Sequence, residues 1–456
     1  MRARFVILVV LGVFLTWEVV TRGVTAYLAE ASPELAIGLR ASQATALLNL
    51  AEKRLSDLAP KVEPGPAPND ALSKEVQSQQ SLDGAARPDP RPTFDSEPQA
   101  PTLVQIRTLA ERALANEPLS ARALRILGRL LLLVSDDQRA EAFMHAAARR
   151  SLFESDAVTW MMQKSYQDQN YHAAIGYADT LLRTRENVFD FVMPILGRMA
   201  ENKAAAGELR QLLSVNTAWR QEFFRRLPGS ISDARTPLGI FLSLKDTAAP
   251  PTNAELRDYL NFLVGRKLYE LAYYTWLQFL PPERLSKVGN LFNGGFEVMP
   301  SGLPFDWVWD EKPGATIQIA TRPDHEGGRA LYIEFGSGRV DFPRTNQLIM
   351  LPPGGYQFRG SYQADIISPR GLQWRITCAG GKEAPIGESS MVTRRGLAWQ
   401  DFEFSFTVPK ADCPAQYVTL VSGARSASEQ FISGTIWYDD LKIVNESVIA
   451  PLKGAL

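Results

Sequence analysis

The sequence has little of several residue types on which common functional sites depend. Only three histidines and two cysteines occur among 456 residues, and 49 lysines and arginines face 50 aspartates and glutamates, for a net charge of -1. His145, His172 and His325 are scattered, which excludes a histidine-rich metal centre, because such a centre needs several imidazoles close together. The balanced charge provides no overall basic field for a nucleic-acid backbone, so no nucleic-acid partner is expected.

Motifs of common enzymes are also missing. The sequence contains no G-x-S-x-G, no H-E-x-x-H and no P-loop. A glycosidase would need two carboxylates at a defined separation, and Glu334, Asp365 and Glu403 could supply such a pair. Nothing in the spacing of these three acids distinguishes them from other surface acids. We therefore expect a protein that is not an enzyme.

An apolar stretch lies at the N-terminus. Arg2 and Arg4 precede an uncharged run at residues 5–17 (FVILVVLGVFLTW), which is typical of a segment inserted in a membrane. These 13 residues suit the core of a signal peptide and are fewer than the roughly 20 that span a bilayer. Because an apolar helical face continues to Leu28, we expect an uncleaved membrane anchor over residues 1–30. A cleaved signal peptide is the alternative.

The basic N-terminal end indicates the orientation of this anchor. Positive residues stay on the cytoplasmic side of a membrane, which predicts a single-pass protein of the inner (plasma) membrane with a cytoplasmic N-terminus and the bulk of the chain in the periplasm. Cys378 and Cys413 could pair in such an oxidising compartment. A disulfide there would contribute roughly 3 to 4 kcal/mol, and two buried free thiols are the alternative.

Two short segments follow the anchor. Residues 31–59 begin with Ser32-Pro33-Glu34 and then repeat apolar residues at intervals of three and four, which predicts a small helical hairpin near the membrane. Residues 60–101 are rich in proline and polar residues and have few large apolar ones. Such a segment cannot bury enough surface to fold alone, so it is interpreted as a disordered linker.

A repeat emerges beyond the linker when the sequence is compared with itself at an offset of 34 residues. In the first unit the matching residues are Ala123, Leu127, Leu131 and Ala140. Their equivalents in the next unit, in the same order, are Ala157, Met161, Ser165 and Ala174. Over roughly residues 102–200 the sequence resembles the tetratricopeptide repeat (TPR) family, whose small residues at Gly128 and Ala140 let paired helices approach closely. Met162 departs from the family, which prefers glycine there.

Helical periodicity continues beyond the repeats. Apolar residues recur at helical spacing as far as Leu285, with prolines between the segments. We predict a TPR-like α-solenoid over residues 102–285, which would offer a surface to other envelope proteins. The aromatic residues between positions 259 and 279 are interpreted as core or interface packing rather than as a binding site.

The periodicity changes to two in the last third of the chain. From Leu291 onward, short alternating segments are separated by turn residues, which predicts an antiparallel β-sandwich of the jelly-roll type over residues 286–446, followed by a tail at 447–456. The segments read as strands are residues 330–335, 356–365, 372–378, 401–408, 416–423 and 435–444. The fold class is therefore multidomain, helical first and then β.

Two short sequences at the ends of this region carry a second resemblance. Asn293–Glu297 (NGGFE), Trp307 and the closing Trp437–Leu441 (WYDDL) resemble the edges of the galactose-binding-like jelly roll in family 4 and 9 carbohydrate-binding modules. The similarity spans about residues 290–445. It implies a glycan or polysaccharide as a ligand.

The same resemblance implies a structural calcium ion near the strand ends. Glu297 and Asp440 are the candidate ligands, because calcium takes hard oxygen donors. The alternative is that both residues are ordinary surface acids. No other cofactor is required.

Strand alternation separates an inner from an outer face. The residues predicted to face the core are Leu331, Ile333, Phe335, Tyr356, Phe358, Tyr362, Leu372, Trp374, Ile376, Cys378, Phe402, Phe404 and Phe406. On the opposite face Tyr332 offers an aromatic platform, Arg359 and Arg375 could pair with an acidic sugar, and Trp309 could stack a ligand at the rim. The alternative is a plain solvated face of a sheet.

These features together predict a non-catalytic, membrane-anchored scaffold of the bacterial envelope that assists assembly or export of a surface polysaccharide. The helical repeats would hold a partner protein, and the sandwich would hold a glycan or a second partner. One alternative is a pure protein-interaction scaffold with a structural sandwich, and another is a polysaccharide hydrolase or lyase. Fold alone does not decide between them.

Overall fold

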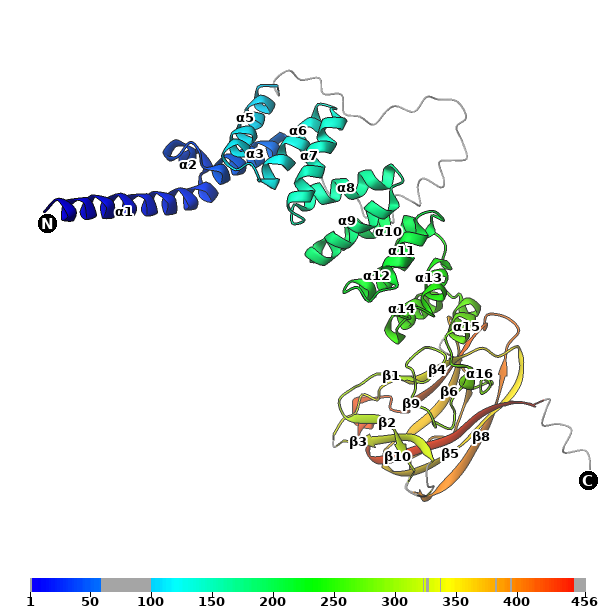
Figure 1. Cartoon of the computed structure of the whole chain (residues 1–456). Helices are drawn as coiled ribbons and strands as arrows, with labels where there is room; N and C mark the ends of the chain where they lie inside the picture. The colour runs from blue at the N-terminus through cyan, green and yellow to red at the C-terminus, as the bar shows by residue number, and fades with distance from the viewer. Residues whose placement is uncertain are drawn as a thin grey trace, which may run out of the picture. The chain divides into compact units, whose positions relative to one another are not determined.

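The computed structural model describes residues 2–58, 100–322, 324, 328–336, 338–381, 384–393 and 396–446. Two compact units divide the chain, Met1–Val192 and Met193–Leu456. The first unit is helical, and the second begins with helices and ends in a β-sandwich (Figure 1). His325 and the tail predicted at residues 447–456 lie outside the described residues.

The first helix, α1 (Arg2–Ala31), was predicted to be a membrane anchor. Charged residues interrupt its second half, where Arg22 lies 3.5 Å from Glu18. The end of α1 packs on protein, since Ala29 is fully buried in a cluster with α2 and α3. Within the residues that the structure describes, every helix is too short or too polar to span a bilayer.

The predicted membrane anchor over residues 1–30 is therefore wrong. The inner-membrane location, with a cytoplasmic N-terminus and a periplasmic bulk, is wrong with it. Hydropathy suggested the anchor, but the second half of this helix carries charges and uses small residues to pack against its neighbours.

The segment predicted as a helical hairpin contains two helices, α2 (Pro33–Leu39) and α3 (Ala44–Leu58). The Asn49 side chain of α3 donates a hydrogen bond to the Ala29 carbonyl at 2.6 Å, which ties the end of α1 to α3. The linker predicted at residues 60–101 lies outside the described residues, except for its last two residues, which open the next helix.

Five further helices and a short 3-10 turn complete the first unit. They are α5 (Ala100–Asn116), α6 (Ala121–Leu133), α7 (Asp137–Arg150), α8 (Ser155–Gln167), α9 (Tyr171–Thr184) and η2 (Glu186–Val188). Ser120, Asp136 and Asn170 cap α6, α7 and α9, because each side chain accepts a backbone N–H of the first turn. The helices α6 and α7 pack together, as do α8 and α9.

Small residues allow these helices to approach each other. Ala123 and Ala157 are fully buried, as are Ala140 and Ala174, and the members of each pair are 34 positions apart. A Cβ atom at Gly128 would lie 3.1 Å from Cγ of Met144 on α7, so the glycine permits a close contact there. The region is thus helical, with small residues at the contacts between consecutive helices.

A buried arginine links three helices of this unit. Arg125 on α6 pairs with Glu52 on α3 and with Glu154 next to α8, where its Nε atom lies 2.7 Å from the carboxylate. Burial alone would raise the pKa of Glu52, but the hydrogen bonds and charges of Arg122 and Arg125 outweigh it and hold this pKa below its ordinary value.

The second unit opens with helices that share an aromatic core. The helix α10 (Phe189–Glu201) crosses the division between the units, and the elements that follow are α11 (Ala206–Leu213), α12 (Arg220–Arg226), η3 (Leu227–Gly229), α13 (Thr236–Leu244), α14 (Asn253–Gly265), α15 (Tyr269–Gln278) and α16 (Pro282–Leu285). Arg220 and Glu255 form an ion pair at 2.9 Å, and both side chains are only 3% exposed. The Glu255 carboxylate also accepts the Thr252 N–H in a capping box that begins α14.

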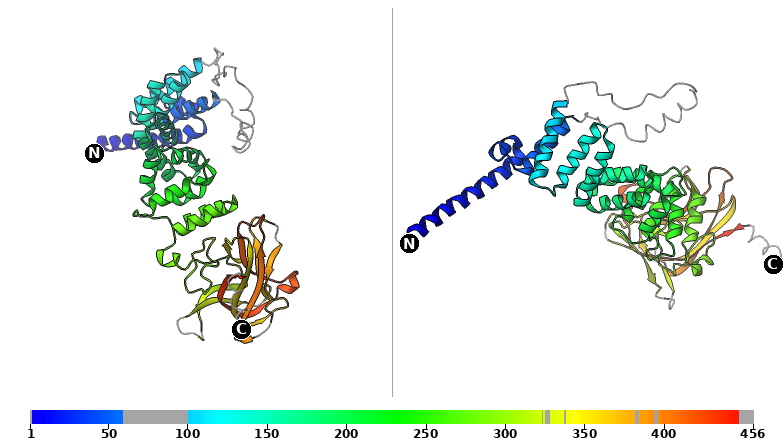
Figure 2. Two further views of the ribbon diagram at one scale, coloured as in Figure 1. Left: turned by 90° about the vertical axis from the view of Figure 1, so that its right-hand side faces the viewer. Right: turned by 45° about the horizontal axis from the view of Figure 1, so that its top comes forward.

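The rest of the second unit is the predicted sandwich of two antiparallel sheets (Figure 2). Its strands are β1 (Val308–Trp309), β2 (Ala315–Thr321), β3 (Arg329–Phe335), β4 (Thr345–Ile349), β5 (Gly354–Ile367), β6 (Leu372–Cys378), β7 (Pro385–Glu388), β8 (Gly396–Val408), β9 (Gln416–Ser422) and β10 (Ser433–Asn445). Sheet A has the order β1-β4-β9-β6-β7, and sheet B has the order β2-β3-β10-β5-β8. A short turn, η4 (Ala427–Gln430), precedes β10.

The space between the sheets is filled as strand alternation predicts. Trp374 of sheet A contacts Phe358 and Tyr438 of sheet B, with ring centroids 5.7 and 5.3 Å apart. Leu331 and Ile333 are fully buried in the same cluster, whereas Phe402 and Phe404 are only partly buried at its edge. The inner residues of β3, β5, β6 and β8 were therefore predicted by strand alternation.

The two sequences that carried the second resemblance meet in the fold. Leu441 in β10 donates its N–H to the Gly294 carbonyl at 3.0 Å. A Cβ atom at Gly294 would lie 2.0 Å from the Leu441 oxygen, so only glycine fits there. The Trp307 indole donates to the Asn293 carbonyl at 3.0 Å, which ties Trp307 to the opening segment.

Two aromatic residues of α15, Tyr273 and Trp276, pack as expected, whereas Tyr274 is 63% exposed. Trp276 lies 5.1 Å from Phe292, and Tyr273 lies 5.2 Å from Phe305, measured between ring centroids. Phe292 and Phe305 belong to the segment that leads into the sandwich. These rings join α15 to the segment that leads into the sandwich.

Candidate functional site

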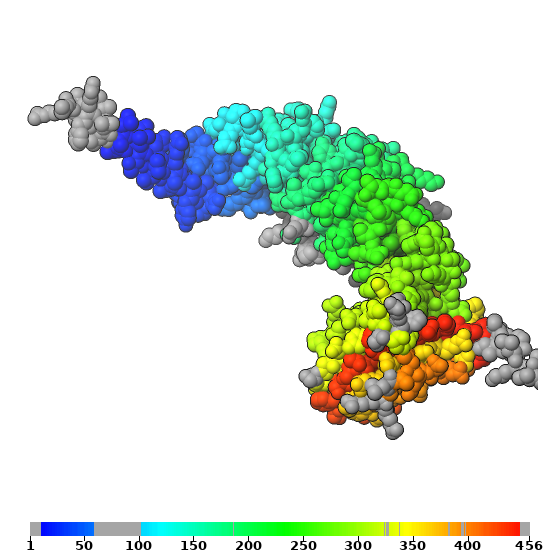
Figure 3. Space-filling view, turned by 60° about the horizontal axis from the view of Figure 1, so that its bottom comes forward, coloured from blue at the N-terminus to red at the C-terminus, as the bar shows by residue number. Residues whose placement is uncertain are grey.

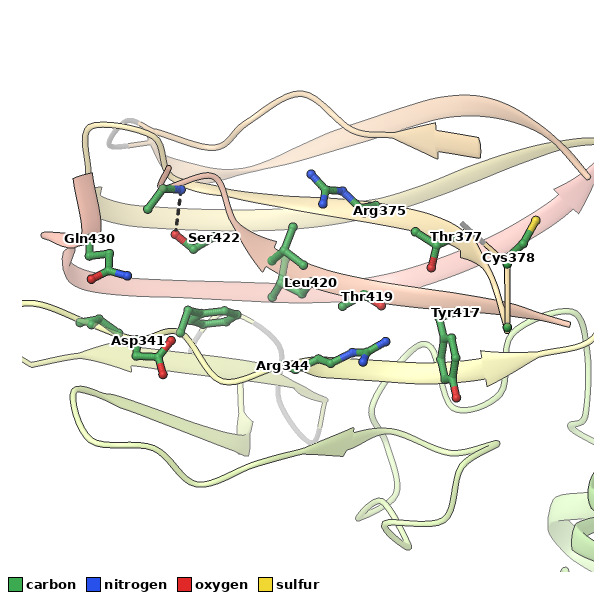
Figure 4. A pocket seen from close by; sticks show the side chains of 16 residues that line it. Asp341, Arg344, Arg375, Thr377, Cys378, Tyr417, Thr419, Leu420, Ser422 and Gln430 are labelled. Atoms are coloured by element: carbon green, nitrogen blue, oxygen red, sulfur yellow. Dashed lines mark hydrogen bonds between the residues drawn. The ribbon is translucent and has the colours of Figure 1, made fainter. Parts of the chain in front are cut away.

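A groove with a volume of about 600 Å³ lies on the outer face of sheet A (Figure 4). Tyr417 and Thr419 of β9 line it together with Arg375 and Thr377 of β6. These side chains point away from the interior, because the residues that alternate with them belong to the core. The floor of the groove is thus built from two neighbouring strands.

Two loops form the walls of this groove. Val340 and Phe342 belong to the segment before β4, and Gln430 to the turn before β10. The Val340 N–H donates to the Gln430 carbonyl at 2.9 Å, which fixes one loop to the other. The Asp341 carboxylate accepts a hydrogen bond from Lys312 at 2.7 Å. The walls are therefore held by contacts within the sandwich.

The register of the strands places polar side chains in rows across the floor. Thr419 is the cross-strand partner of Asn346 in β4 and of Arg375 in β6. Thr377 is the partner of Tyr417 in the next row. Side chains at directly opposite positions lie about 5 Å apart at Cβ. The rows therefore present closely spaced hydrogen-bonding groups.

Tyr417 and Arg344 together form the aromatic part of the groove. The Arg344 guanidinium lies 5.1 Å from the centre of the Tyr417 ring, and Figure 4 shows the Arg344 side chain extending toward that ring. Burial raises the pKa of the Tyr417 hydroxyl, and the positive charge of Arg344 opposes that rise. The hydroxyl is therefore neutral at physiological pH, where it can both donate and accept a hydrogen bond.

Arg375 is held by an acid at the edge of the groove. Its Nε atom lies 2.7 Å from the Glu388 carboxylate of β7, and Gln373 donates to the same oxygen at 2.8 Å. Both members of the ion pair are more than a third exposed, so a ligand can exchange with Glu388 at small cost. The ion pair with Glu388 thus positions the Arg375 side chain and still leaves it able to bind a ligand.

The predicted site residues do not come together. Arg375 lies in the groove on sheet A, whereas Tyr332 and Arg359 lie on the outer face of sheet B. Tyr332 packs against Trp437, with ring centroids 4.4 Å apart. Trp309 in β1 pairs with the edge of β4 and packs partly on the core. The prediction that Tyr332, Arg359 and Arg375 share one face is therefore wrong, because β5 and β6 belong to different sheets.

A second hollow, of about 620 Å³, contains Arg359 on the outer face of sheet B. In Figure 3 the red of β10 and the orange of β8 lie on this face. Ser361 donates to Asp401 at 2.7 Å, and Lys442 lies 3.3 Å from Asp440. Acids and their partners dominate this hollow, so the groove on sheet A offers the better combination of aromatic and polar groups.

The candidate calcium ligands have other partners. Glu297 accepts the Arg329 N–H at 3.3 Å, and Asp440 pairs with Lys442. The buried acid near them is Asp439, and Arg322 donates to its carboxylate at 2.7 Å. Among the described residues no group of three or more His, Cys, Asp or Glu side chains is arranged to hold a metal ion. A structural calcium ion stays a prediction.

Cys378 and Cys413 form a disulfide, with an S–S distance of 2.00 Å. The bond joins the end of β6 to the segment before β9, and Cys378 also lines the groove. The predicted pairing is confirmed. The alternative of two free thiols does not apply.

Sequence reasoning missed three residues of the groove, Arg344, Tyr417 and Thr419. Strand 416–423 was predicted, but its apolar and polar residues are too mixed for the outer face to be recognised from composition. The alternation of the apolar residues Val418 and Leu420 with Tyr417 and Thr419 is the signal that could have identified the two residues of this strand.

Comparisons with known proteins give only structural similarity. No family model matches the chain, and no curated protein sequence does. A family 4 carbohydrate-binding module is 18% identical, with 34% of this chain and 99% of that chain covered and a TM-score of 0.27. TmCBM61, solved with β-1,4-galactotriose, is 20% identical, with 35% and 99% covered and a TM-score of 0.24. The CBM22-1 xylan-binding domain from Paenibacillus barcinonensis Xyn10C is 11% identical, with 30% and 85% covered and a TM-score of 0.22.

Proposed function

We propose that the sandwich binds a glycan chain in the groove on sheet A. The observation that carries this proposal is the placement of an aromatic ring, Tyr417, beside rows of polar side chains that line one groove on the outer face of sheet A. The C–H face of a pyranose is apolar and packs against aromatic rings, while its hydroxyls need hydrogen-bonding partners. The groove supplies both kinds of contact.

The donors and acceptors of the groove match what sugar hydroxyls require. Thr377, Thr419 and the Tyr417 hydroxyl line the groove, and each can donate and accept a hydrogen bond. A ring at the wall, Phe342, adds a second apolar surface. The lining of the groove is more polar than that of a typical small-molecule pocket, which suits a ligand as rich in hydroxyl groups as a glycan.

We propose binding without turnover. The acids at the groove, Asp341 and Glu388, are each engaged by a cation, Lys312 and Arg375 respectively. Carboxyl pairs that hydrolyse a glycoside need one acid with a raised pKa and a second acid free to act on the sugar. The groove is better suited to holding a glycan than to cleaving it.

We further propose that helices α5–α9 form TPR-like repeats that bind a partner protein. The buried alanines that recur at an interval of 34 residues support this proposal. A chain with both properties would serve as a scaffold between a protein and a surface polysaccharide during its assembly or export. A pure protein-interaction scaffold with a structural sandwich is the competing proposal.

Affinity electrophoresis of the full chain in native gels that contain purified polysaccharides tests the glycan proposal. Tyr417→Ala should weaken binding at least tenfold, about 1.4 kcal/mol, because the ring and its hydroxyl are lost together. Tyr332→Ala on sheet B is the matched control and should bind as the natural chain does. Thermal unfolding of both variants checks that they fold.

Two results would contradict the proposal. One is a chain that none of the polysaccharides retards. The other is binding that survives Tyr417→Ala and is lost in Tyr332→Ala, which would move the site to sheet B. The pure scaffold proposal predicts the first of these results.

A further inference from the structure

We propose that the groove selects glycans that carry carboxylate groups and that Arg344 binds the carboxylate. The inference rests on the proposed glycan binding and adds the chemical class of the ligand. It starts from the difference between Arg344 and the other cations of the sandwich.

Arg344 is the cation at the groove that has no acid partner among the described residues. Its side chain is exposed, and its recorded contact is the one with the Tyr417 ring. By contrast, Arg375 is paired with Glu388, and Lys312 is paired with Asp341. An arginine that neither an acid nor a backbone carbonyl engages keeps its five N–H donors available.

The charge balance at the groove leaves an excess of one positive charge. The two ion pairs cancel within the described lining, so the uncompensated charge belongs to Arg344. A second guanidinium, that of Arg375, lies on the same face, behind an exposed ion pair that an incoming carboxylate can replace. An anionic ligand is therefore favoured over a neutral one of the same shape.

The Tyr417 ring gives this cation a defined place. A guanidinium over an aromatic face is attracted by the ring electrons, so the side chain is held along the groove and does not sample solvent freely. A planar, positioned guanidinium binds a carboxylate through two parallel hydrogen bonds. In a sugar acid the carboxylate is attached directly to the pyranose ring, so one residue could contact Tyr417 and Arg344 together.

The test compares acidic polysaccharides with their own neutral derivatives. Polygalacturonate, alginate and hyaluronan are each used as such and after carboxyl reduction, which converts the uronic acids to neutral sugars in the same backbone. Affinity electrophoresis of the full chain measures the ratio of the two affinities. We expect at least one acidic polymer to bind about tenfold tighter than its reduced form, with a preference that weakens at high salt.

Variants of Arg344 test whether this residue causes the preference for acidic polymers. Arg344→Gln should bring the ratio of the two affinities close to one, because the positive charge is removed. Arg344→Lys should give an intermediate ratio, because the charge remains but the planar guanidinium that can form two parallel hydrogen bonds is lost. Arg359→Gln on sheet B is the matched control and should keep the ratio of the natural chain. The circular dichroism spectrum of each variant is compared with that of the natural chain to check that the variant is folded.

The outcomes separate the two proposals. Equal binding of acidic and reduced polymers, with loss of both in Tyr417→Ala, overturns carboxylate selection and leaves glycan binding intact. A preference for acid that persists in Arg344→Gln overturns the role of Arg344. Failure to bind any polymer in either form, neutral glycans included, overturns glycan binding itself and carboxylate selection with it.

Discussion

The disulfide between Cys378 and Cys413 should supply a large part of the stability of the sandwich. The two residues are 35 positions apart, with Cα atoms separated by 5.0 Å. For a loop of that length the chain-entropy model gives about 4 kcal/mol at 25 °C. The loop contains β7 and β8, so opening the bond frees an outer strand of each sheet to leave the sandwich.

Hydrogen exchange of the full chain, followed by mass spectrometry, measures this effect. A loss of about 4 kcal/mol corresponds to exchange roughly a thousandfold faster from globally protected amides. Reduction with a phosphine should produce that acceleration in peptides from β6, β8 and β9. Peptides from α6–α9 contain no cysteine and serve as an internal control within the same molecule.

A variant with both cysteines replaced by alanine distinguishes the covalent link from effects of the reductant. It should exchange as the reduced chain does. Acceleration of less than tenfold in β6 and β9 would refute the reasoning, since it would mean that the closed loop contributes less than about 1.4 kcal/mol.

Three further predictions concern stability. Arg220→Met should cost about 3–5 kcal/mol in urea unfolding, because it leaves the buried Glu255 carboxylate without its cation; a cost below 1 kcal/mol would show that the pair is dispensable. The pKa of Glu52 is held below its ordinary value, so its contribution is present above the unfolded-state pKa and is lost as the pH falls through the folded-state pKa. Thermal unfolding of the natural chain should therefore shift to lower temperature in acid, and Glu52→Gln should flatten that shift; identical acid profiles would contradict the assignment. Gly371→Ala should lower the melting temperature, because φ is +71° and the added Cβ atom would lie 1.8 Å from a backbone oxygen, and an unchanged melting temperature would count against this geometry.

Local patterns in the sequence predicted the parts of the sandwich that depend on local rules. Alternation identified the inner residues Leu331 and Trp374, which are buried, because side-chain direction is fixed by the strand itself. The glycines of the opening segment, such as Gly294, were recognised as part of a frame, and the structure gives their physical reason in a close backbone approach.

Properties that depend on distant contacts could not be predicted in the same way. Arg359 and Arg375 were assigned to one face because strand alternation points both side chains away from the core. Here β5 and β6 belong to different sheets, and no property of either strand alone encodes that choice.

The first helix shows a second limit of prediction from the sequence. Hydropathy over residues 5–17 suggested a membrane anchor, since a window average does not register what the following residues contact. Ala29 and Thr25 are buried, and Asn49 binds the Ala29 carbonyl. Packing of the end of this helix on its neighbours was not visible in the sequence.

The most direct test of the central claim is a crystal structure of the chain with an oligosaccharide from the tightest-binding polysaccharide. We predict that the sugar lies in the groove on sheet A, in contact with Tyr417, and that a carboxylate, where the sugar has one, meets Arg344. A sugar bound beside Arg359 on the outer face of sheet B, or on the helices, would contradict the account.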